Sequence, residues 1–580
     1  MCGIAGIFQY NHSETVNSNE LSKINNTMQL RGPDDSGLWL NAEKTVGLAH
    51  RRLSIIDLSS GAKQPMQLSD SELYITFNGE IYNYQKLRDD LIQQGCFFKT
   101  NSDTEVILKL YQVYGIDMLS KLRGMFAFAI WDDKNKSLLC ARDPFGIKPF
   151  YFSDNGKSFK FASQVKALLQ ASEINTAQSA AGQIGFYLLG SVPEPYTLYE
   201  GIKSLPAGHY LLLNQSGQKI QKEFYSIKSV FIKAENSDCS LNSSSLTESL
   251  YDTVKHHLIA DVDVGVFLSA GIDSSTLVNI ASDILPQKIN TITLGFNEYK
   301  HTAQDEVPLA EMVSSYFGTH QKTVYISESM AQDEYQKILL AMDQPSIDGI
   351  NTYFVSQAAS QAGLKVALSG LGADELFFGY PLFSRIPKLF NYTKHLSQTG
   401  KLFRQLSKKI IPAKYASILE YGNTVSNAYF LSRALYLPWE LDFLDPELVK
   451  KGLAELNLFE RLNQDMTGIK SVQFQLSALE LQWYMKNQLL RDSDWASMAH
   501  SLEIRVPFVD TVFFETVTQL NAKSHLTKRN LATAPHKALP DAILNKKKTG
   551  FNIPVSTWFS KSTDMKIFSK TIYKQWMKSI

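Results

Sequence analysis

The sequence predicts two domains of different fold class: an α+β domain over residues 2–215 and an α/β domain with a parallel sheet over residues 246–580, joined by a linker over residues 216–245. Three observations predict this division. The chain has 580 residues, which is too long for a single hydrophobic core. Short strand-like segments dominate its first part, whereas strands and helices alternate in its second part. A stretch rich in Ser and Asn lies between them.

The first domain is expected to contain an antiparallel meander and two helices. β-branched and aromatic residues between turn-forming residues indicate strands at residues 73–77, 124–131, 137–141, 148–152 and 159–162. Apolar residues at helical spacing indicate helices at residues 84–94 and 104–114. Such a mixture favours layers of sheet and helix.

The second domain is expected to begin with a helix, because Ser245-Leu-Thr-Glu248 fits a capping box. Apolar strands follow at residues 262–268, 289–294 and 365–368, and a further helix begins at about Ser274. Strands that alternate with helices indicate a parallel sheet with helices on both faces. From about Phe383 onward the chain is expected to be mostly helical.

The composition is that of a folded, soluble protein. Hydrophobic residues make up 44% of the chain and charged residues 20%, which excludes disorder, collagen and coiled coil as whole-chain classes. Lys and Arg number 58 and Asp and Glu 57, so the net charge of +1 gives no overall field toward nucleic acid or an anionic membrane. Such a partner would need a local patch, and we expect neither a nucleic-acid partner nor a membrane partner.

The cysteines and the first residues indicate the compartment. The four cysteines are far apart and form no Cys-x-x-Cys pair, which argues against a zinc ribbon and a disulfide framework. The start of the chain lacks the basic and apolar regions of a signal peptide, and no apolar run is long enough for a spanning helix. We therefore expect a cytoplasmic protein.

Cys2 is a candidate nucleophile. Removal of the initiator methionine would place the thiol and a free α-amine on the same residue. An α-amine titrates at about 8 and a thiol at about 8.5, so the amine can take the thiol proton without a histidine base. Such a nucleophile suits amides. The alternative is a buried structural cysteine.

Other polar residues of the first domain could serve an amide substrate. Asn78 and Gly79 follow the strand at residues 73–77, where a side-chain amide and a backbone N–H could hold an oxyanion. The alternative is an ordinary Asn-Gly turn. Arg52 and Asp103 would suit the carboxylate and the ammonium of an amino acid, or could equally be a surface ion pair or a helix cap.

Six motifs together resemble the class II glutamine amidotransferase domain over residues 2 to 210. They are Met1-Cys-Gly-Ile-Ala-Gly, Arg31-Gly-Pro-Asp-Asp, His50-Arg-Arg-Leu-Ser-Ile-Ile-Asp, Phe77-Asn-Gly-Glu-Ile-Tyr-Asn, Ser102-Asp-Thr-Glu and Ala141-Arg-Asp-Pro-Phe-Gly-Ile-Lys-Pro. The resemblance implies an N-terminal-nucleophile hydrolase sandwich (αββα). It also implies that Cys2 attacks the glutamine amide, that Asn78 and Gly79 form the oxyanion hole, and that glutamine is bound by these two residues with Arg52, Glu80 and Asp103.

A second set of residues suits a nucleotide. The segment Val266 to Ser275 runs from an apolar strand through small residues into a helix, where backbone N–H groups and hydroxyls can surround phosphate. A plain strand-to-helix turn is equally compatible with this segment. Asp273 would repel phosphate unless a cation intervenes, which predicts Mg²⁺, and Asp374 after the strand at residues 365–368 is the second candidate ligand. Lys548 could bring a cation to a phosphoryl transition state, or could lie in a solvated turn.

With motifs at residues 490–494 and 497–510, these segments resemble the ATP-pyrophosphatase domain of the glutamine-dependent asparagine synthetases over roughly residues 245 to 560. The resemblance implies ATP as a substrate, Mg²⁺ at Asp273 and Asp374, catalysis by Lys548, and a homodimer. The residues that it places in contact with ATP are Leu268, Ser269, Gly271, Asp273, Ser274, Ser275, Leu294, Ser369 and Gly370.

Three positions depart from the family pattern. Ala270 replaces a loop glycine, which is acceptable only where positive φ and close approach to phosphate are not needed. Leu371 stands where the best-known members have an acid for the adenylation step. The stretch from Asp343 to Tyr353, which should border the acceptor pocket, lacks an Arg that some members use to bind aspartate.

The sequence therefore predicts an enzyme that hydrolyses glutamine and uses ATP to make an amide through an acyl-adenylate, with aspartate as the leading acceptor. Ammonia is expected to pass between the domains through an apolar passage. Leu371 favours a rival with another carboxylate, such as a sugar uronic acid. A nucleic-acid-modifying pyrophosphatase is disfavoured by the neutral charge, and a non-catalytic paralogue by the presence of Cys2, Asp273 and Asp374.

Overall fold

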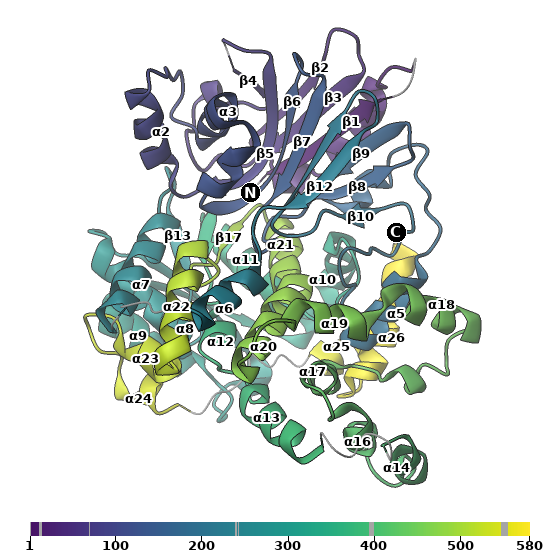
Figure 1. The fold of residues 1–580 in the computed structure, drawn as a ribbon. Coiled ribbons are helices and arrows are strands. Elements are labelled where there is room, and N and C mark those ends of the chain that lie inside the picture. Colours follow the sequence, from purple (N-terminus) through teal and green to yellow (C-terminus); the bar gives the residue numbers. More distant parts are fainter. Residues whose placement is uncertain are drawn as a thin grey trace.

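The computed structural model describes residues 2–10, 14–68, 70–237, 241, 243–393, 400–546 and 555–579. Figure 1 shows a strand-rich N-terminal half stacked on a helix-rich C-terminal half. Among the described residues, none of the helices combines the length and the apolar character needed to cross a bilayer.

The N-terminal half contains two six-stranded antiparallel sheets, with strand orders β10-β8-β9-β1-β3-β2 and β12-β11-β7-β6-β5-β4. The strands are β1 (Gly3–Gln9), β2 (Asp35–Leu40), β3 (Val46–Arg52), β4 (Met66–Gln67), β5 (Leu73–Ile81), β6 (Gly124–Asp132), β7 (Ser137–Arg142), β8 (Tyr151–Asp154), β9 (Ser158–Ala162), β10 (Lys203–Ser204), β11 (His209–Asn214) and β12 (Lys219–Glu223).

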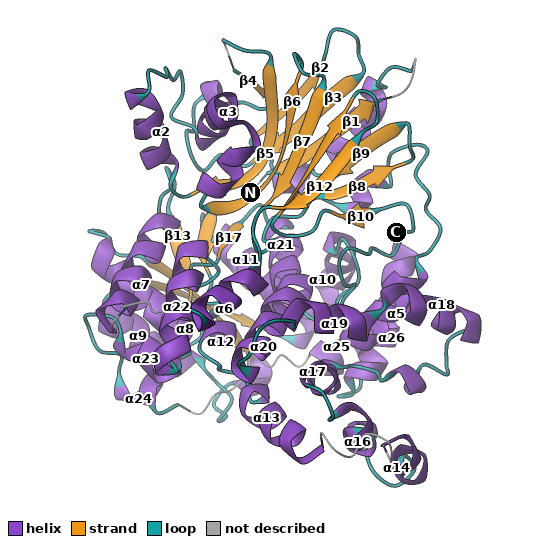
Figure 2. Ribbon diagram, viewed as in Figure 1, coloured by secondary structure: helices purple, strands orange, loops and turns teal. Residues whose placement is uncertain are grey.

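These sheets form the inner layers of a four-layer sandwich. Large apolar side chains such as Phe8, Trp131 and Phe159 fill the space between the sheets. Helix α1 (Ser18–Thr27) packs on the outer face of the first sheet, and α2 (Tyr84–Gln93) and α3 (Asp103–Tyr114) pack on the outer face of the second. The predicted αββα order of layers is confirmed, and it can be followed in Figure 2.

The five strands and two helices expected in this half are all present, with shifted ends. The strand expected at residues 148–152 is β8, which begins only at Tyr151, because Pro149 has no N–H for a sheet hydrogen bond. β5 runs to Ile81 and pairs with β6 along its whole length. Asn78 and Gly79 therefore lie within a paired strand and do not form a hairpin turn.

The C-terminal half is built on a five-stranded parallel sheet with strand order β15-β14-β13-β16-β17. Its strands are β13 (Val264–Phe267), β14 (Asn290–Phe296), β15 (His320–Ile326), β16 (Val366–Leu368) and β17 (Glu503–Arg505). β15 and β17 were not among the predicted strands. The segment Glu-Ile-Arg of β17 is short and charged at both ends, so its pattern does not indicate a buried strand.

Helices surround this sheet and form most of the chain after Phe383, as expected (Figure 2). Those near the sheet are α7 (Ser243–His257), α8 (Ile272–Ile284), α9 (Val307–Phe317), α10 (Glu328–Ala341), α11 (Ile350–Gln361), α21 (Arg491–Met498), α22 (Thr511–Ser524) and α23 (Lys528–Thr533). The others used below are α13 (Leu382–Thr393), α14 (Gly400–Ser407), α15 (Ala413–Ala416), α16 (Ile418–Tyr421) and α17 (Val425–Arg433).

Two elements lie where the sequence predicts a linker over residues 216–245. β12 is the edge strand of the second antiparallel sheet, and α6 (Ile227–Glu235) buries Phe231 in the core around the parallel sheet. Helix α7 begins at Ser243, two residues before the predicted capping box. The chain thus passes from one half to the other between β12 and α6.

Buried ion pairs join the two halves. Arg31, in the N-terminal half, contacts Asp494 of α21 through both ends of its guanidinium, at 2.6 and 2.9 Å. Arg123 contacts Asp510, the residue that caps α22, at 2.8 and 2.9 Å. All four side chains are almost fully buried. Charges buried in this way are tolerable only while both partners are in place.

Replacing Arg123 by Met should therefore destabilise the protein strongly. Arg123→Met leaves the buried carboxylate of Asp510 without its guanidinium, and the free energy of unfolding should fall by about 3 kcal/mol. Urea unfolding monitored by tryptophan fluorescence measures this change. Lys451→Met, which removes an exposed pair with Glu200, is the matched control and should leave the unfolding midpoint close to that of the parent. Equal unfolding midpoints for the two variants would contradict the prediction.

Two candidate active sites

The first candidate site surrounds Cys2, which is buried where the two halves meet. The Cys2 carbonyl accepts a hydrogen bond of 3.0 Å from Nε of Arg31, the same guanidinium that contacts Asp494 in the C-terminal half. The thiol lies 3.9 Å from the carbonyl oxygen of Leu53. Burial raises the pKa of the Cys2 thiol, so the thiol needs a base close by to become a nucleophile at neutral pH.

Asn78 offers an unused hydrogen-bond donor beside Cys2. Its Oδ1 accepts a hydrogen bond of 2.8 Å from the backbone nitrogen of Cys2, which fixes the orientation of the carboxamide. Its Nδ2 is buried and has no hydrogen-bond partner among the described residues. An unsatisfied buried donor costs about 1–3 kcal/mol, so an oxygen atom bound there would be stabilised.

Gly79 has no side chain that could cover the backbone next to Asn78. Its φ is +151°, and a Cβ at this position would lie 2.0 Å from the carbonyl oxygen of Met125 on the neighbouring strand. Only glycine can occupy this position without moving β5 away from β6.

Arg52 and Asp103 flank this group from two other elements. Arg52, the last residue of β3, donates to the carbonyl oxygens of Asp57 and Ser59. Asp103 begins α3 and accepts a hydrogen bond of 3.0 Å from the Ile81 backbone nitrogen. Burial raises the pKa of Asp103 to about 6. Strands β1, β3 and β5 and helix α3 thus bring the predicted residues of this site together.

Glu80 connects this site to the parallel sheet of the other half. Its carboxylate lies 3.7 Å from the guanidinium of Arg505 in β17, and the Arg505 Nε contacts Glu503 at 2.7 Å. Burial, together with the charge of Glu503, holds the pKa of Glu80 well above its usual range. The backbone oxygen of Arg505 accepts a hydrogen bond of 2.9 Å from Ser369 of the second candidate site. Arg505 therefore contacts both sites, a link that the sequence did not predict.

The second candidate site is a cavity of about 290 Å³ at the carboxyl ends of β13, β14 and β16. Eight of the nine residues predicted to contact ATP line this cavity together with Asp374: Leu268, Ser269, Gly271, Asp273, Ser274, Leu294, Ser369 and Gly370. The ninth, Ser275, is fully buried in α8 and does not line it. Ligands of open parallel sheets gather at this edge.

The loop after β13 holds Ala270 in a left-handed conformation. Its φ is +53°, so the condition on which the alanine was expected to be acceptable is not met. This conformation costs an alanine roughly 1 kcal/mol. Hydrogen bonds between Ser269 and Ser274, each of 3.3 Å, hold the two ends of the loop together.

Asp273 and Asp374 share a cation in the structure. The ammonium group of Lys528 in α23 lies 2.5 Å from an oxygen of Asp273 and 2.9 Å from an oxygen of Asp374. One positive group can thus contact both carboxylates, and such a pair of carboxylates would also suit Mg²⁺. In the described part of the chain, no group of three or more His, Cys, Asp and Glu residues is placed to hold a metal, and Asp273 and Asp374 are a pair.

Lys528 was not predicted from the sequence, because a single lysine in Thr527-Lys-Arg-Asn acquires meaning only from the two carboxylates that α23 places beside it. Lys548, the predicted catalytic lysine, lies outside the described residues.

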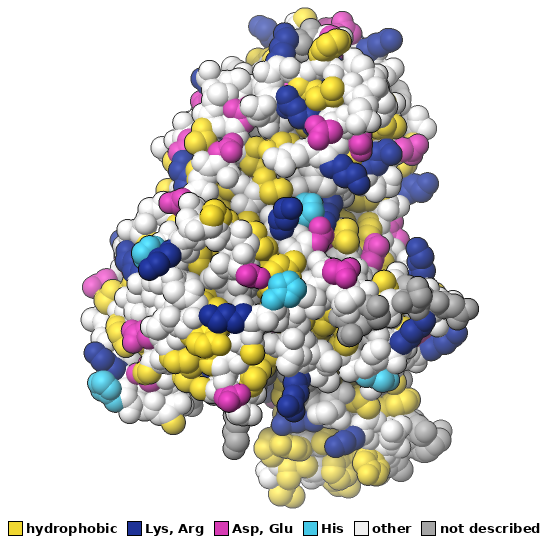
Figure 3. Space-filling view, turned by 90° about the vertical axis from the view of Figure 1, so that its left-hand side faces the viewer, with side chains coloured by type: hydrophobic (Ala, Val, Ile, Leu, Met, Phe, Trp, Pro, Cys, Tyr) yellow, Lys and Arg dark blue, Asp and Glu magenta, His cyan; other side chains and the backbone are white. Residues whose placement is uncertain are grey.

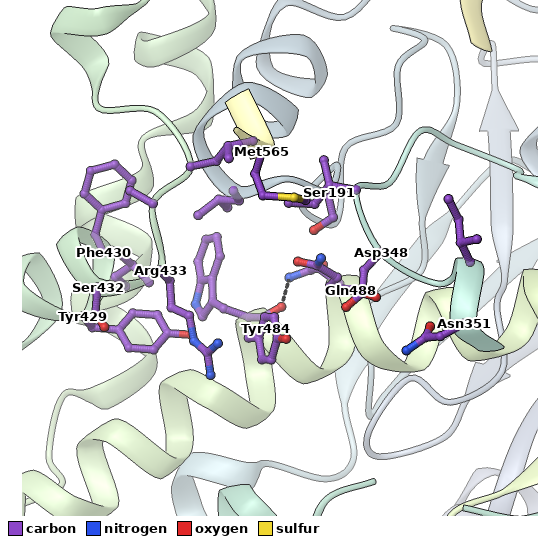
Figure 4. A pocket seen from close by; sticks show the side chains of 18 residues that line it. Ser191, Asp348, Asn351, Tyr429, Phe430, Ser432, Arg433, Tyr484, Gln488 and Met565 are labelled. Carbon is purple, nitrogen blue, oxygen red and sulfur yellow. Dashed lines mark hydrogen bonds between the residues drawn. The ribbon is translucent and has the colours of Figure 1, made fainter. Parts of the chain in front are cut away.

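A second, larger cavity of about 400 Å³ adjoins the first, and Asn351 lines both. Figure 4 shows Asp348, Gln488 and Asn351 on one side of it, and Tyr429, Phe430 and Arg433 on the other. We call this space the acceptor-side cavity, because it adjoins the 290 Å³ cavity at Asn351.

Asp348 brings a carboxyl group to the wall of the acceptor-side cavity, and burial raises its pKa. No ion pair joins Asp348 to a cation among the described residues, whereas the guanidinium of Arg433 is already neutralised by Glu480. Burial and the nearby charge of Asp348 raise the pKa of Asp492 to about 7. A cationic group in this cavity would therefore be stabilised beside Asp348.

Comparisons with known proteins match the whole chain in two parts. Residues 1–225 match the family model of the glutamine amidotransferase domain, and residues 245–577 match the model of asparagine synthase. The chain is 34% identical to asparagine synthetase (glutamine-hydrolyzing) 1 of Bacillus subtilis, over 96% of this chain and 88% of that protein. It is 30% identical to asparagine synthetase (glutamine-hydrolyzing) 3 of the same organism, over 95% of this chain and 87% of that protein.

Proposed function

This chain belongs to the glutamine-hydrolysing asparagine synthetase family, and from that premise we propose that it converts ATP, L-aspartate, L-glutamine and water to AMP, diphosphate, L-asparagine and L-glutamate. The observation that carries the proposal is the buried, unpartnered Nδ2 of Asn78 beside Cys2, because this donor suits the oxyanion of an amide under attack.

In the N-terminal half, Cys2 is the nucleophile. The backbone nitrogen of Cys2 is hydrogen-bonded to Oδ1 of Asn78. Removal of Met1 turns this nitrogen into an amine, which can accept the thiol proton. The sulfur then attacks the carboxamide carbon of glutamine, and Nδ2 of Asn78 and the backbone of Gly79 bind the developing oxyanion. Collapse of this intermediate releases ammonia and leaves a thioester, which water hydrolyses to glutamate.

Three charged residues hold the rest of the glutamine. The guanidinium of Arg52 suits the α-carboxylate, and Asp103 suits the α-ammonium. Glu80 is the third residue that the family pattern assigns to glutamine binding. These assignments follow the family pattern, residue by residue.

In the C-terminal half, ATP use follows from the family, and the 290 Å³ cavity supplies its site. Ser269, Gly271 and Ser274 would bind the phosphates at the start of α8, and Leu268 and Leu294 would contact the base. Asp273 and Asp374 would hold Mg²⁺, which supplies positive charge to the phosphates when it is bound. Lys528 would then move from the carboxylates to a phosphate oxygen, and Lys548 keeps its predicted catalytic role.

Adenylation makes the acceptor reactive. A carboxylate oxygen attacks the α-phosphorus of ATP, diphosphate leaves, and the resulting mixed anhydride is attacked by ammonia, with AMP as the second leaving group. We assign the acceptor-side cavity to aspartate. Its α-ammonium would bind Asp348, while its side-chain carboxylate would face Ser369 and Gly370 past Asn351.

The first test follows both half-reactions in one assay. The protein with a free N-terminal Cys2, given ATP, Mg²⁺, glutamine and aspartate, should release diphosphate and asparagine in equal amounts. Cys2→Ala should lower glutamine-dependent synthesis at least about a thousandfold, and ammonium chloride should restore synthesis because it bypasses the nucleophile. Glutaminase activity without any aspartate-dependent diphosphate would remove aspartate from the proposal.

The pKa of Asp103 predicts a pH dependence of glutamine use. Below about pH 6 the Asp103 carboxylate becomes protonated in the free enzyme and no longer attracts the ammonium of glutamine. The value of kcat/KM for glutamine hydrolysis should fall about tenfold for each pH unit below this point. Asp103→Asn should be weakly active with no such titration, and a profile of the parent enzyme that stays flat to pH 5 would contradict the assignment.

Asp348→Asn tests the assignment of the acceptor-side cavity. Loss of the ion pair with the substrate ammonium should raise KM for aspartate at least about tenfold, while glutaminase activity stays unchanged. Succinate, which lacks the ammonium, should compete poorly with aspartate in the parent enzyme and about equally in the variant. Asp442→Asn, an exposed position, is the matched control. An unchanged KM for aspartate in an active Asp348→Asn enzyme would exclude this role of Asp348.

A further inference from the structure

One segment of the chain carries a local charge that the whole chain lacks. Between Glu375 and Glu420 the sequence has no Asp or Glu, although the totals over the chain are nearly equal, 58 basic and 57 acidic residues. The Lys and Arg residues of the same stretch are Arg385, Lys388, Lys394, Lys401, Arg404, Lys408, Lys409 and Lys414. We call its described helices, α13, α14 and α15, the basic lobe. Figure 1 shows α13 and α14 at the lower end of the molecule, far from the antiparallel sheets.

Helix α14 and the residues that follow it turn their apolar side away from the protein. Leu402 and Leu406 are spaced by four residues and therefore share one face of α14, and Ile410 lies in the turn that follows. The three side chains are 60%, 71% and 83% exposed. Of the basic side chains, Arg404 turns inward, whereas Lys401, Lys408 and Lys409 are exposed. Arg404 contacts Glu420 of α16 at 2.5 Å and lies over the ring of Trp439. A surface helix of a globular protein normally buries its apolar face, so this orientation is the reverse of the usual one.

Other apolar side chains extend the same surface. Of the 19 large hydrophobic side chains that are exposed in the described part of the chain, six lie between Tyr392 and Tyr415. They are Tyr392, Leu402, Phe403, Leu406, Ile410 and Tyr415. The lowest part of the surface in Figure 3, where the basic lobe lies, shows hydrophobic side chains gathered beside Lys and Arg. Contiguous exposed apolar surface of this kind marks an interaction site.

The charges of the basic lobe select among possible partners. Lys401, Lys408 and Lys409 are exposed around the apolar residues, and Arg385 and Lys388 are exposed on α13. A second copy of the chain placed face to face on the lobe would bring these like charges together, which disfavours a symmetric dimer through this face. An anionic lipid surface instead offers acyl chains to the apolar side chains and negative headgroups to the lysines.

We propose that the basic lobe docks this protein on the surface of an anionic membrane, with Leu402, Leu406 and Ile410 inserted among the headgroups and the surrounding lysines bound to anionic lipid. The docking is peripheral, in keeping with the absence of a spanning helix among the described residues. It revises the expectation of no membrane partner, which rested on a net charge averaged over the whole chain. It is independent of the proposed reaction, because no residue of the basic lobe lines either cavity.

Sedimentation with vesicles tests the proposal on the full chain. Vesicles of phosphatidylcholine with about 30% phosphatidylglycerol should bind the protein at least about tenfold more tightly than vesicles of phosphatidylcholine alone. Raising the salt from about 0.05 M to about 0.5 M should weaken this binding, because the lysine contacts are screened. Leu406→Glu with Ile410→Glu should lower binding to the anionic vesicles at least about tenfold and leave asparagine synthesis and thermal stability unchanged.

A matched double variant separates the basic lobe from exposed apolar surface in general. Ile92 and Phe97 are 49% and 87% exposed in the N-terminal half, so Ile92→Glu with Phe97→Glu introduces the same charges far from the lobe and should bind vesicles like the parent. Light scattering of all three proteins shows whether the lobe joins two copies. The proposal is overturned if the active parent protein does not bind anionic vesicles, if the lobe variant binds as the parent does, or if that variant only converts a dimer to a monomer.

Discussion

Burial of charge between the two halves is the constraint on which the rest of the structure depends. Moving a charged group out of water costs several kcal/mol unless the group forms an ion pair with a group of opposite charge. The groups that pair with Arg31 and Arg123 belong to the other half of the chain. Each half is therefore complete only when docked on the other. Because Arg31 also bonds the Cys2 carbonyl, the same contact that joins the halves positions the nucleophile.

The short strand β17 connects the two reaction sites through one residue. The backbone of Arg505 pairs with β16, and its carbonyl oxygen accepts a hydrogen bond from the backbone nitrogen of Ser369. Its guanidinium lies beside the carboxylate of Glu80, which is close to Cys2. β17 is held by backbone pairing with β16 and by the buried contacts of Arg505 with Glu503 and Glu80. The edge of the parallel sheet that we propose to bind ATP and the site around Cys2 that we propose to bind glutamine thus share one structural element.

Motifs whose residues are adjacent in the chain could be predicted from the sequence. Contacts between residues that only the fold brings together could not. The loop residues Ser269 to Ser274 and the pair Asn78 and Gly79 are adjacent in the chain, so their pattern indicates their geometry. Lys528 lies more than 150 residues from either carboxylate that it contacts, and β17 lacks an apolar strand pattern because its side chains serve ion pairs. The net charge of +1 did not indicate the basic lobe, because a charge summed over a long chain does not show a local cluster of basic residues.

The ion pairs across the interface also limit how such an enzyme can be rebuilt. Arg31 and Asp494 are 463 positions apart in the sequence, and Arg123 and Asp510 are 387 apart. A chimaera that joins this N-terminal half to the C-terminal half of a relative must therefore bring compatible partners for both arginines, or it buries two uncompensated charges at the junction. When such enzymes exchange halves, in the laboratory or in evolution, both residues of each ion pair must therefore stay compatible, although they lie far apart in the sequence.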